Sequence, residues 1–354
     1  MSSSNDPKGW HKLPFELRLE IIEFAIAAPE LPIPSTAQEG RTERYNHRDW
    51  VTSETWGSSG LWEEPAKTPT ANLLLVNKQF HNDVKYILDL LPNAYHVDVM
   101  VVKDYGLWPT WYCLKPPSSD VIEEVTVTFR IFEPTNDLDD RFKESLTFWA
   151  GDGGPEAAVW PFHQLFLTLT SDGLGLFSKN CRDSRSSPPK YIVKRIKMNI
   201  LSPTDGVAHT RLWCREGENP WWLRILYLHR NPTPAKPGDQ LADFIARWMF
   251  TISRPSTYTY PFVGRYYQNL VEDISLQING AEHARLDPDQ ALKDTYSQKH
   301  LGLPLQRWCR GLRKTRAKTK QRFEYEERPK AREMSNSQLC LEDYQLSQCI
   351  VTTQ

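Results

Sequence analysis

The chain of 354 residues lacks the features that would place it in a membrane or among small disulfide-stabilised domains. It has no uninterrupted run of about 18 apolar residues, so we expect no membrane span. Its first residues, MSSSNDPKG, contain no apolar stretch and do not resemble a signal peptide. The six cysteines form no CxxC pair, and a chain of this length does not need disulfides for stability. We therefore favour a reduced protein of the nucleus or cytoplasm.

Motifs that carry enzyme chemistry are also missing. The sequence contains no HExxH, GxSxG, GxGxxG or DFG motif. The acidic turn formed by Asp137, Asp139 and Asp140 lacks the glycine and the distal glutamate of a calcium loop. We therefore predict no catalytic residue, no metal site and no cofactor, and we expect that the protein is not an enzyme.

The net charge is close to zero, but positive charge is concentrated in one segment of the sequence. The net charge of −1 argues against attraction of the whole surface to nucleic acid or to an anionic membrane. Residues 307–322, however, carry eight basic side chains and no acid, and subtracting these eight leaves −9 on the rest of the chain. The eight are Arg307, Arg310, Arg313, Lys314, Arg316, Lys318, Lys320 and Arg322. Like charges repel, so we expect this segment to be exposed, either simply solvated or recognised by an import receptor or by nucleic acid.

Two amphipathic helices are predicted near the start of the chain. The first covers residues 13–27, LPFELRLEIIEFAIA, where Pro14 suits the first turn and Ile22 and Ile26 widen the apolar stripe. That stripe consists of Leu13, Leu17, Ile21 and Phe24. The second helix is expected over residues 72–91 and ends before Pro92. Together the two helices have more apolar surface than so small a core can bury, which favours a docking role.

Residues 28–71 separate these helices and are rich in proline. We interpret them as a long loop that is partly ordered by its tryptophans, Trp50, Trp56 and Trp62, which dock onto the neighbouring domain. The alternative, a ligand-stacking role for these rings, is less common for tryptophan.

The elements LPFELRLEII and LLLVNKQFH resemble the F-box, in the variant common in fungal proteins. The resemblance covers residues 13–91, about a fifth of the chain, with residues 28–71 as an insertion. It implies a small helical module that binds a Skp-family adaptor and thereby joins a cullin-RING ubiquitin ligase. The rest of an F-box protein selects the protein to be ubiquitinated.

The resemblance also implies which side chains meet the adaptor. From the first helix these are Leu13, Pro14, Leu17 and Ile21. From the second they are Leu74, Leu75, Val76 and Phe80, which divide between the adaptor and the contact between the two helices. In the alternative interpretation, both helices only pack against the second domain.

The region that follows is rich in predicted strands. Residues 122–129, 193–200 and 271–278 are similar segments whose starts lie 71 and 78 residues apart. Each alternates apolar and polar residues from its fourth position, which indicates a half-buried strand. A further strand is expected at residues 96–102, and helices are expected at 161–169, 239–252 and 287–298.

Alternating strands and helices predict a mostly parallel sheet with right-handed crossovers. The spacing is too long for an ordinary leucine-rich repeat, but the arrangement resembles a degenerate version of one, a kind of domain that F-box proteins often carry. Loops at the strand carboxyl ends, residues 133–140, 202–211 and 279–286, form the region where we would test for partner recognition. Tryptophans of the neighbouring segments either serve in that recognition or, as we favour, pack in the core: Trp108, Trp111, Trp213, Trp221 and Trp222.

The sequence thus predicts an α+β protein with four parts. Residues 1–9 are disordered, 10–91 form the F-box-like helical module, 95–305 form an α/β substrate-recognition domain, and 306–354 form a basic segment and a disordered tail. The function that follows is substrate recognition within a cullin-RING (SCF-type) ubiquitin ligase. The alternatives are an F-box-like scaffold without a ligase role, or a nucleic-acid-binding or enzymatic α/β protein.

Overall fold

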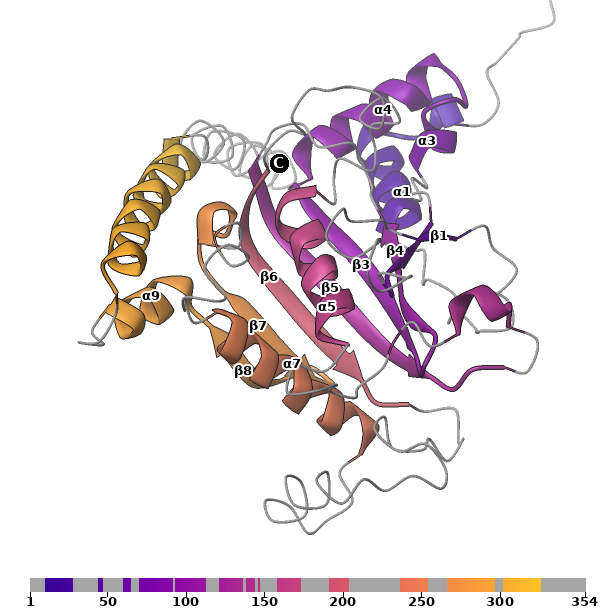
Figure 1. The fold of residues 1–354 in the computed structure, drawn as a ribbon. Coiled ribbons are helices and arrows are strands. Elements are labelled where there is room, and N and C mark those ends of the chain that lie inside the picture. The colour runs from indigo at the N-terminus through magenta and orange to yellow at the C-terminus, as the bar shows by residue number, and fades with distance from the viewer. Residues whose placement is uncertain are drawn as a thin grey trace, which may run out of the picture.

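A mixed six-stranded sheet forms the centre of the protein, as a computed structural model shows (Figure 1). The structure describes residues 10–27, 44–46, 60–64, 70–91, 93–112, 121–135, 138–143, 146, 158–172, 191–203, 236–253, 264, 267–296 and 302–325. The sheet has the order β4-β3-β5-β6-β7-β8. Its strands are β3 (Ala94–Val102), β4 (Gly106–Tyr112), β5 (Val121–Phe132), β6 (Ile192–Leu201), β7 (Ile274–Ile278) and β8 (Ala281–Leu286).

The sheet has a parallel centre and antiparallel edges. β3, β5, β6 and β7 run parallel to one another, whereas β4 is antiparallel to β3 and β8 is antiparallel to β7. The predicted α+β class is therefore confirmed, and the four predicted strands form the parallel centre. The two edge strands make the sheet mixed.

The three similar segments of the sequence lie side by side in register. Between β5 and β6, Ile122 pairs with Val193 and Phe129 with Ile200. Between β6 and β7, Ile200 pairs with Ile278. These pairings have the same offsets, 71 and 78 residues, as the starts of the similar segments in the sequence. The apolar alternation of each strand consequently faces the same side of the sheet.

Two helices cover that apolar side, α5 (Val159–Leu167) and α7 (Pro237–Ser253) (Figure 1). Their aromatic rings meet above the sheet, with Phe162 and Phe244 5.5 Å apart and Phe166 and Trp248 4.7 Å apart between ring centroids. Phe129 of β5 lies beneath Phe162 at 6.1 Å. The helices predicted at residues 161–169 and 239–252 are confirmed, and they build the largest core of the protein.

Strand β4 was not predicted. Its side chains Trp108 and Trp111 are buried, so the core interpretation of these two tryptophans is confirmed. Pro109 interrupts the strand pattern in the sequence, but β4 tolerates proline because it is an edge strand: it pairs along its length with β3 only, and on its other side the N–H of Leu107 donates to the carbonyl oxygen of Gly60 at 2.8 Å. The other three tryptophans considered for recognition lie outside the described residues: Trp213, Trp221 and Trp222.

The prediction of a loop at residues 279–286 is wrong, because β8 occupies most of this segment. Asn279 and Gly280 form the two-residue turn between β7 and β8 with φ angles of 49° and 82°. An Asn-Gly pair is the usual sequence for such a tight hairpin turn. This end of the sheet is therefore a hairpin.

Six further short elements are described. They are η1 (Trp10–Lys12), β1 (Tyr45–Asn46), β2 (Trp62–Glu63), η2 (Asp140–Phe142), η3 (Thr168–Asp172) and α9 (Pro288–Tyr296). Trp62 packs 4.6 Å from the ring of Phe142 in a cluster with Trp108, which confirms the docking predicted for Trp62. Trp50 and Trp56 lie outside the described residues.

A helical unit precedes the sheet and consists of α1 (Phe15–Ala27), α3 (Thr70–Leu73) and α4 (Lys78–Leu90) (Figure 1). The single helix predicted over residues 72–91 is wrong, because the chain turns at residues 74–77. Asn77 caps α4: its Oδ1 accepts a hydrogen bond from the N–H of Phe80 at 2.9 Å. The unit has its own small core: Ile22, Ile26, Val84, Ile87 and Leu88.

Residues 303–325 form a further helix, called the basic helix below. One face of this helix is buried, through Leu305, Cys309, Leu312, Arg316 and Phe323. The expectation of an exposed segment is therefore wrong for Arg316, and the boundary expected after residue 305 falls inside the helix. Helical spacing of its apolar residues is the physical reason, because it gives the helix a face that packs against the sheet domain.

Candidate partner-binding surfaces

The helix α1 has one buried and one exposed apolar face. Ile22 is 0% exposed and Ile26 4%, and both pack against α4. Leu17, Ile21 and Phe24 are 45%, 46% and 75% exposed. Their spacing of four and three residues places them on one line along the helix. The stripe predicted from the sequence is therefore divided: its flank forms the core, and its centre faces outward.

A buried ion pair fixes how α1 sits on α4. Nε of Arg18 lies 2.9 Å from Oδ2 of Asp83, and the side chain of Asp83 is 7% exposed. The indole N–H of Trp10 donates to the same oxygen at 3.3 Å. A charged carboxylate in this position requires such partners, because burial without them is costly. Changing the rotation of α1 would break the pair, so the exposed face of α1 has a defined orientation.

The turn between α3 and α4 adds a second exposed apolar segment. Leu75 is 82% exposed and Val76 59%. Leu74 is half-buried, and its carbonyl oxygen lies 2.9 Å from Nδ1 of His81. Phe80 is also half-buried and packs 4.8 Å from the ring of Trp10. Contacts with His81 and Trp10 therefore hold the two flanks of the turn, while Leu75 and Val76 between them face solvent.

The nominated adaptor-binding residues fall into two groups. Those exposed are Pro14, Leu17, Ile21, Leu75 and Val76, and those half-buried are Leu13, Leu74 and Phe80. Sequence reasoning did not nominate Tyr86 and Leu90 of α4, which are 48% and 64% exposed. Their spacing of four residues was a readable signal.

Exposed large apolar side chains are concentrated in the helical unit. Of the ten such side chains among the described residues, eight belong to this unit, and only Leu303 and Tyr325 lie elsewhere. Scattered exposed apolar residues need no explanation, but a concentration on one small unit is typical of a protein-binding surface.

The sheet face turned away from α5 and α7 carries polar side chains on β3, β5 and β6, although Met100 and Val102 of β3 on the same face are buried in an apolar cluster. Asp98 of β3 pairs with Arg130 of β5 at 2.8 Å, and Glu124 of β5 pairs with Lys197 of β6 at 2.8 Å. Burial, and then the charge of Arg130, lower the pKa of His96 on the same face. These charges pair with one another, but Asp98 is only 2% exposed, so the accessible polar part of this face lies around Glu124 and Lys197.

At the carboxyl ends of β6 and β7, polar side chains also bind one another. The amide of Asn279 donates to Oγ of Ser202 at 2.8 Å, and its Oδ1 accepts from the N–H of Ser202 at 2.9 Å. The N–H of Gly280 donates to Oδ1 of Asn199 at 2.9 Å. Of the three loops expected to recognise a partner, this structure thus describes one as a closed hairpin, and only parts of the other two, at residues 133–135, 138–140 and 202–203.

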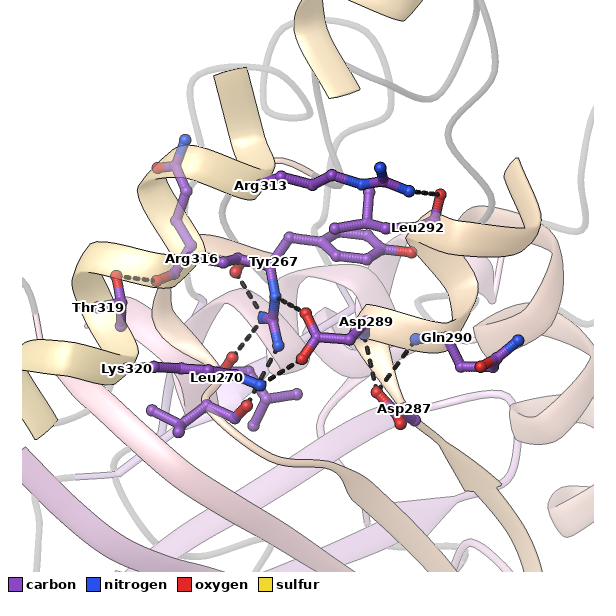
Figure 2. A network of polar contacts seen from close by, with 12 residues as sticks. Tyr267, Leu270, Asp287, Asp289, Gln290, Leu292, Arg313, Arg316, Thr319 and Lys320 are labelled. Carbon is purple, nitrogen blue, oxygen red and sulfur yellow. Dashed lines mark hydrogen bonds and ion pairs between the residues drawn. The ribbon is translucent and has the colours of Figure 1, made fainter. Parts of the chain in front are cut away.

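Arg316 anchors the basic helix through a buried network (Figure 2). Its Nε pairs with Oδ1 of Asp289 at 2.7 Å. Its Nη1 donates to the carbonyl oxygens of Tyr267 at 2.7 Å and Leu270 at 2.6 Å, and its Nη2 donates to that of Val271 at 3.1 Å. A guanidinium suits this site because its donors diverge in a fixed fork.

Asp289 is the acidic partner of this network and lies at the start of α9. Oδ1 of Asp287 accepts from the N–H of Asp289 at 2.8 Å, which caps the helix and positions the carboxylate. Lys320 also donates to Asp289 (Figure 2). Burial raises the pKa of Asp289, but the hydrogen bonds from Arg316 and Lys320 outweigh burial and lower the pKa from 3.8 to about 2.

The opposite face of the basic helix is exposed and basic. Arg307, Arg310, Lys314 and Lys318 follow one another at spacings of three or four residues and are all exposed. We call these four residues the basic stripe. The charge pattern recognised in the sequence therefore has two roles: Arg316 and Lys320 hold the helix, whereas the basic stripe faces outward.

Two kinds of site are missing from the part of the chain that the structure describes. No cluster of three or more His, Cys, Asp or Glu side chains there is arranged to hold a metal ion. None of the described helices is long and apolar enough to cross a membrane. Comparison with models of known families, with curated proteins and with solved structures found no match to this chain.

Proposed function

We propose that this protein is an F-box-like substrate receptor that joins a protein substrate to a cullin-RING (SCF-type) ubiquitin ligase through a Skp-family adaptor. The observation that carries the proposal is the concentration of exposed apolar side chains on the helical unit. The residues that the F-box resemblance nominates include both exposed apolar positions of the α3–α4 turn, Leu75 and Val76.

The exposure of α1 supports the same proposal without the resemblance. Leu17 and Ile21 remain nearly half exposed although Ile22 and Ile26 already supply the contact with α4. Apolar side chains left outside a complete small core gain free energy when a partner covers them. The adaptor in this proposal covers the outward face of α1 and the tip of the α3–α4 turn.

The sheet domain supplies the substrate-recognition part of the proposal. Its in-register parallel strands, with α5 and α7 on one side, support a degenerate leucine-rich-repeat-like domain. On the opposite face, the partly exposed polar side chains of β5 and β6, Glu124 and Lys197 among them, are the part that we propose meets a protein substrate. Such a receptor works in the nucleus or cytoplasm, where ubiquitin ligases of this type act.

Binding to a purified Skp-family adaptor tests the proposal. The full chain should bind the adaptor, and the double variant Leu17→Glu/Ile21→Glu should lose at least about tenfold in affinity, because charges replace apolar contacts at the interface. The matched control is Leu303→Glu/Tyr325→Glu, which makes the same kind of change at exposed apolar positions outside the helical unit. The control should bind as the wild type does.

Each negative result has a separate meaning. Failure of the wild-type chain to bind any Skp-family adaptor refutes the proposed function. Equal binding by both double variants refutes the assignment of the surface but not of the function. Transfer of ubiquitin to a co-purifying protein, in a reconstituted ligase, separates a receptor from a scaffold that has no ligase role.

A further inference from the structure

The basic stripe is carried by a helix whose other face is fixed. Arg316 and Lys320 bind Asp289, and Leu312 and Phe323 are buried against the sheet domain. The helix cannot turn its outward face inward without breaking the Arg316 network. The four cations of the basic stripe are thus presented in a fixed line over the 12 residues 307–318, about 16 Å of helix from first to last.

The basic stripe makes no ion pair in the described part of the chain. The spacing of four residues between Arg310, Lys314 and Lys318 brings like charges together and destabilises the helix. A helix face that served only hydration would mix the two signs. Four unmixed cations on an anchored helix instead fit a polyanionic partner.

The distribution of apolar residues indicates which polyanion. Protein interfaces have an apolar centre and a polar rim, with charged residues depleted at the centre. The outward face of the basic helix has the reverse pattern: its centre is charged, and its exposed apolar residues, Leu303 and Tyr325, lie at the two ends, 22 residues apart. A phosphate backbone needs no apolar centre, because its affinity for cations comes mainly from counterion release.

We propose that the basic stripe binds the phosphate backbone of nucleic acid without reading its sequence. The interaction goes beyond adaptor and substrate binding, since it uses a different face of the molecule. Four cations at spacings of three or four residues contact consecutive phosphates of a duplex along one side. Because base edges are not contacted, affinity depends on salt and hardly on sequence.

Fluorescence anisotropy with the full chain and a labelled DNA duplex of about 20 base pairs tests this proposal. For duplex DNA, log Kd changes with log salt concentration by about 0.9 for each phosphate neutralised. The variant with Arg307, Arg310, Lys314 and Lys318 all changed to Gln should therefore lower this slope by about 3.6. The four contacts of the basic stripe should therefore account for a loss of affinity on the order of 100-fold when the salt concentration rises from 50 to 200 mM.

A second variant separates the basic stripe from net charge. It changes four exposed lysines elsewhere to Gln, namely Lys78, Lys85, Lys236 and Lys293, and so removes the same charge. The proposal expects this control to keep the wild-type slope, and two duplexes of unrelated sequence to bind equally. The proposal fails if the wild type does not bind DNA at 50 mM salt, if both variants lose affinity equally, or if polyglutamate competes as well as DNA at equal charge.

Discussion

Replacing Arg316 with methionine should detach the basic helix from the sheet domain. The Arg316 side chain is 3% exposed and makes its four contacts with one carboxylate and three backbone carbonyls. Methionine has a similar length but no donor, so Arg316→Met leaves these buried acceptors without a partner. A lost donor matters most where water cannot replace it.

The magnitude follows from the burial of the two partners. Removing one partner from a buried ion pair costs about 3–5 kcal/mol. We expect about 3 kcal/mol, near the lower end of that range, because Asp289 is 35% exposed and keeps Lys320 as a partner. The control Arg310→Met changes an exposed arginine of the same helix and should alter stability by less than about 0.5 kcal/mol.

Native-state hydrogen exchange measures the effect of Arg316→Met and of Arg310→Met on the stability of each part of the chain. In Arg316→Met, the amides of residues 303–325 should exchange faster by about two orders of magnitude, which corresponds to about 3 kcal/mol. Urea unfolding followed by circular dichroism gives the free energy of unfolding for the rest of the chain. If Arg316→Met and Arg310→Met give the same exchange rates, the buried network does not hold the helix.

Further predictions concern single groups. The stability contributed by Asp289, whose pKa is lowered from 3.8 to about 2, should be complete above pH 3.8 and lost as the pH falls towards 2, and Asp289→Asn should flatten urea midpoints over that window. His96 should titrate below 6.5 by NMR, because burial and Arg130 favour the neutral ring, and the stability it contributes should fall as the pH drops below 6.5. Gly280→Ala should cost about 1–2 kcal/mol in urea unfolding because its φ is 82°. Cys309, a buried free thiol whose pKa is raised by burial, should react with iodoacetamide only on unfolding, as peptide mapping would show.

Strands at the centre of the sheet could be predicted because their burial is one-sided. β5, β6 and β7 each place apolar side chains towards α5 and α7 at every second residue. That period is visible in a single sequence. The similarity of the three segments carries more information, because equal patterns in neighbouring parallel strands bury the same side only when they pair at the offsets that the structure has.

The edge strands and helix breaks could not be predicted from periodicity. β4 contains Pro109 and buries residues on both faces, so it shows no alternation. β8 is short and mostly exposed, and the Asn279-Gly280 pair was its best signal. Likewise, apolar residues continue through positions 74–76, so the stripe gives no sign of the turn there. The cap at Asn77, which begins α4, is a local polar interaction. Patterns of apolar residues do not record such interactions.

The residues that form the candidate surfaces could not be predicted for a different reason: their exposure depends on tertiary packing. On α1, two apolar lines run along the same helix, and only the position of α4 determines that Ile22 is buried and Ile21 exposed. In the basic helix, all eight cations look alike in the sequence, whereas Asp289 lies on α9 and selects Arg316 and Lys320. On both helices, residues distant in the chain thus determine which side chains are buried and which remain exposed for a partner.

The two proposed surfaces are carried by different elements, the helical unit and the basic helix. The helical unit lies beside the β3–β4 edge, and the basic helix lies beyond α9 on the side of β7 and β8 (Figure 1). A partner on one surface leaves the other accessible. Loss of adaptor binding in Leu17→Glu/Ile21→Glu should therefore leave DNA affinity unchanged, and neutralising the basic stripe should leave adaptor affinity unchanged. A variant of either surface that weakened both interactions would mean that the two sites are coupled through the sheet domain, contrary to their separate cores.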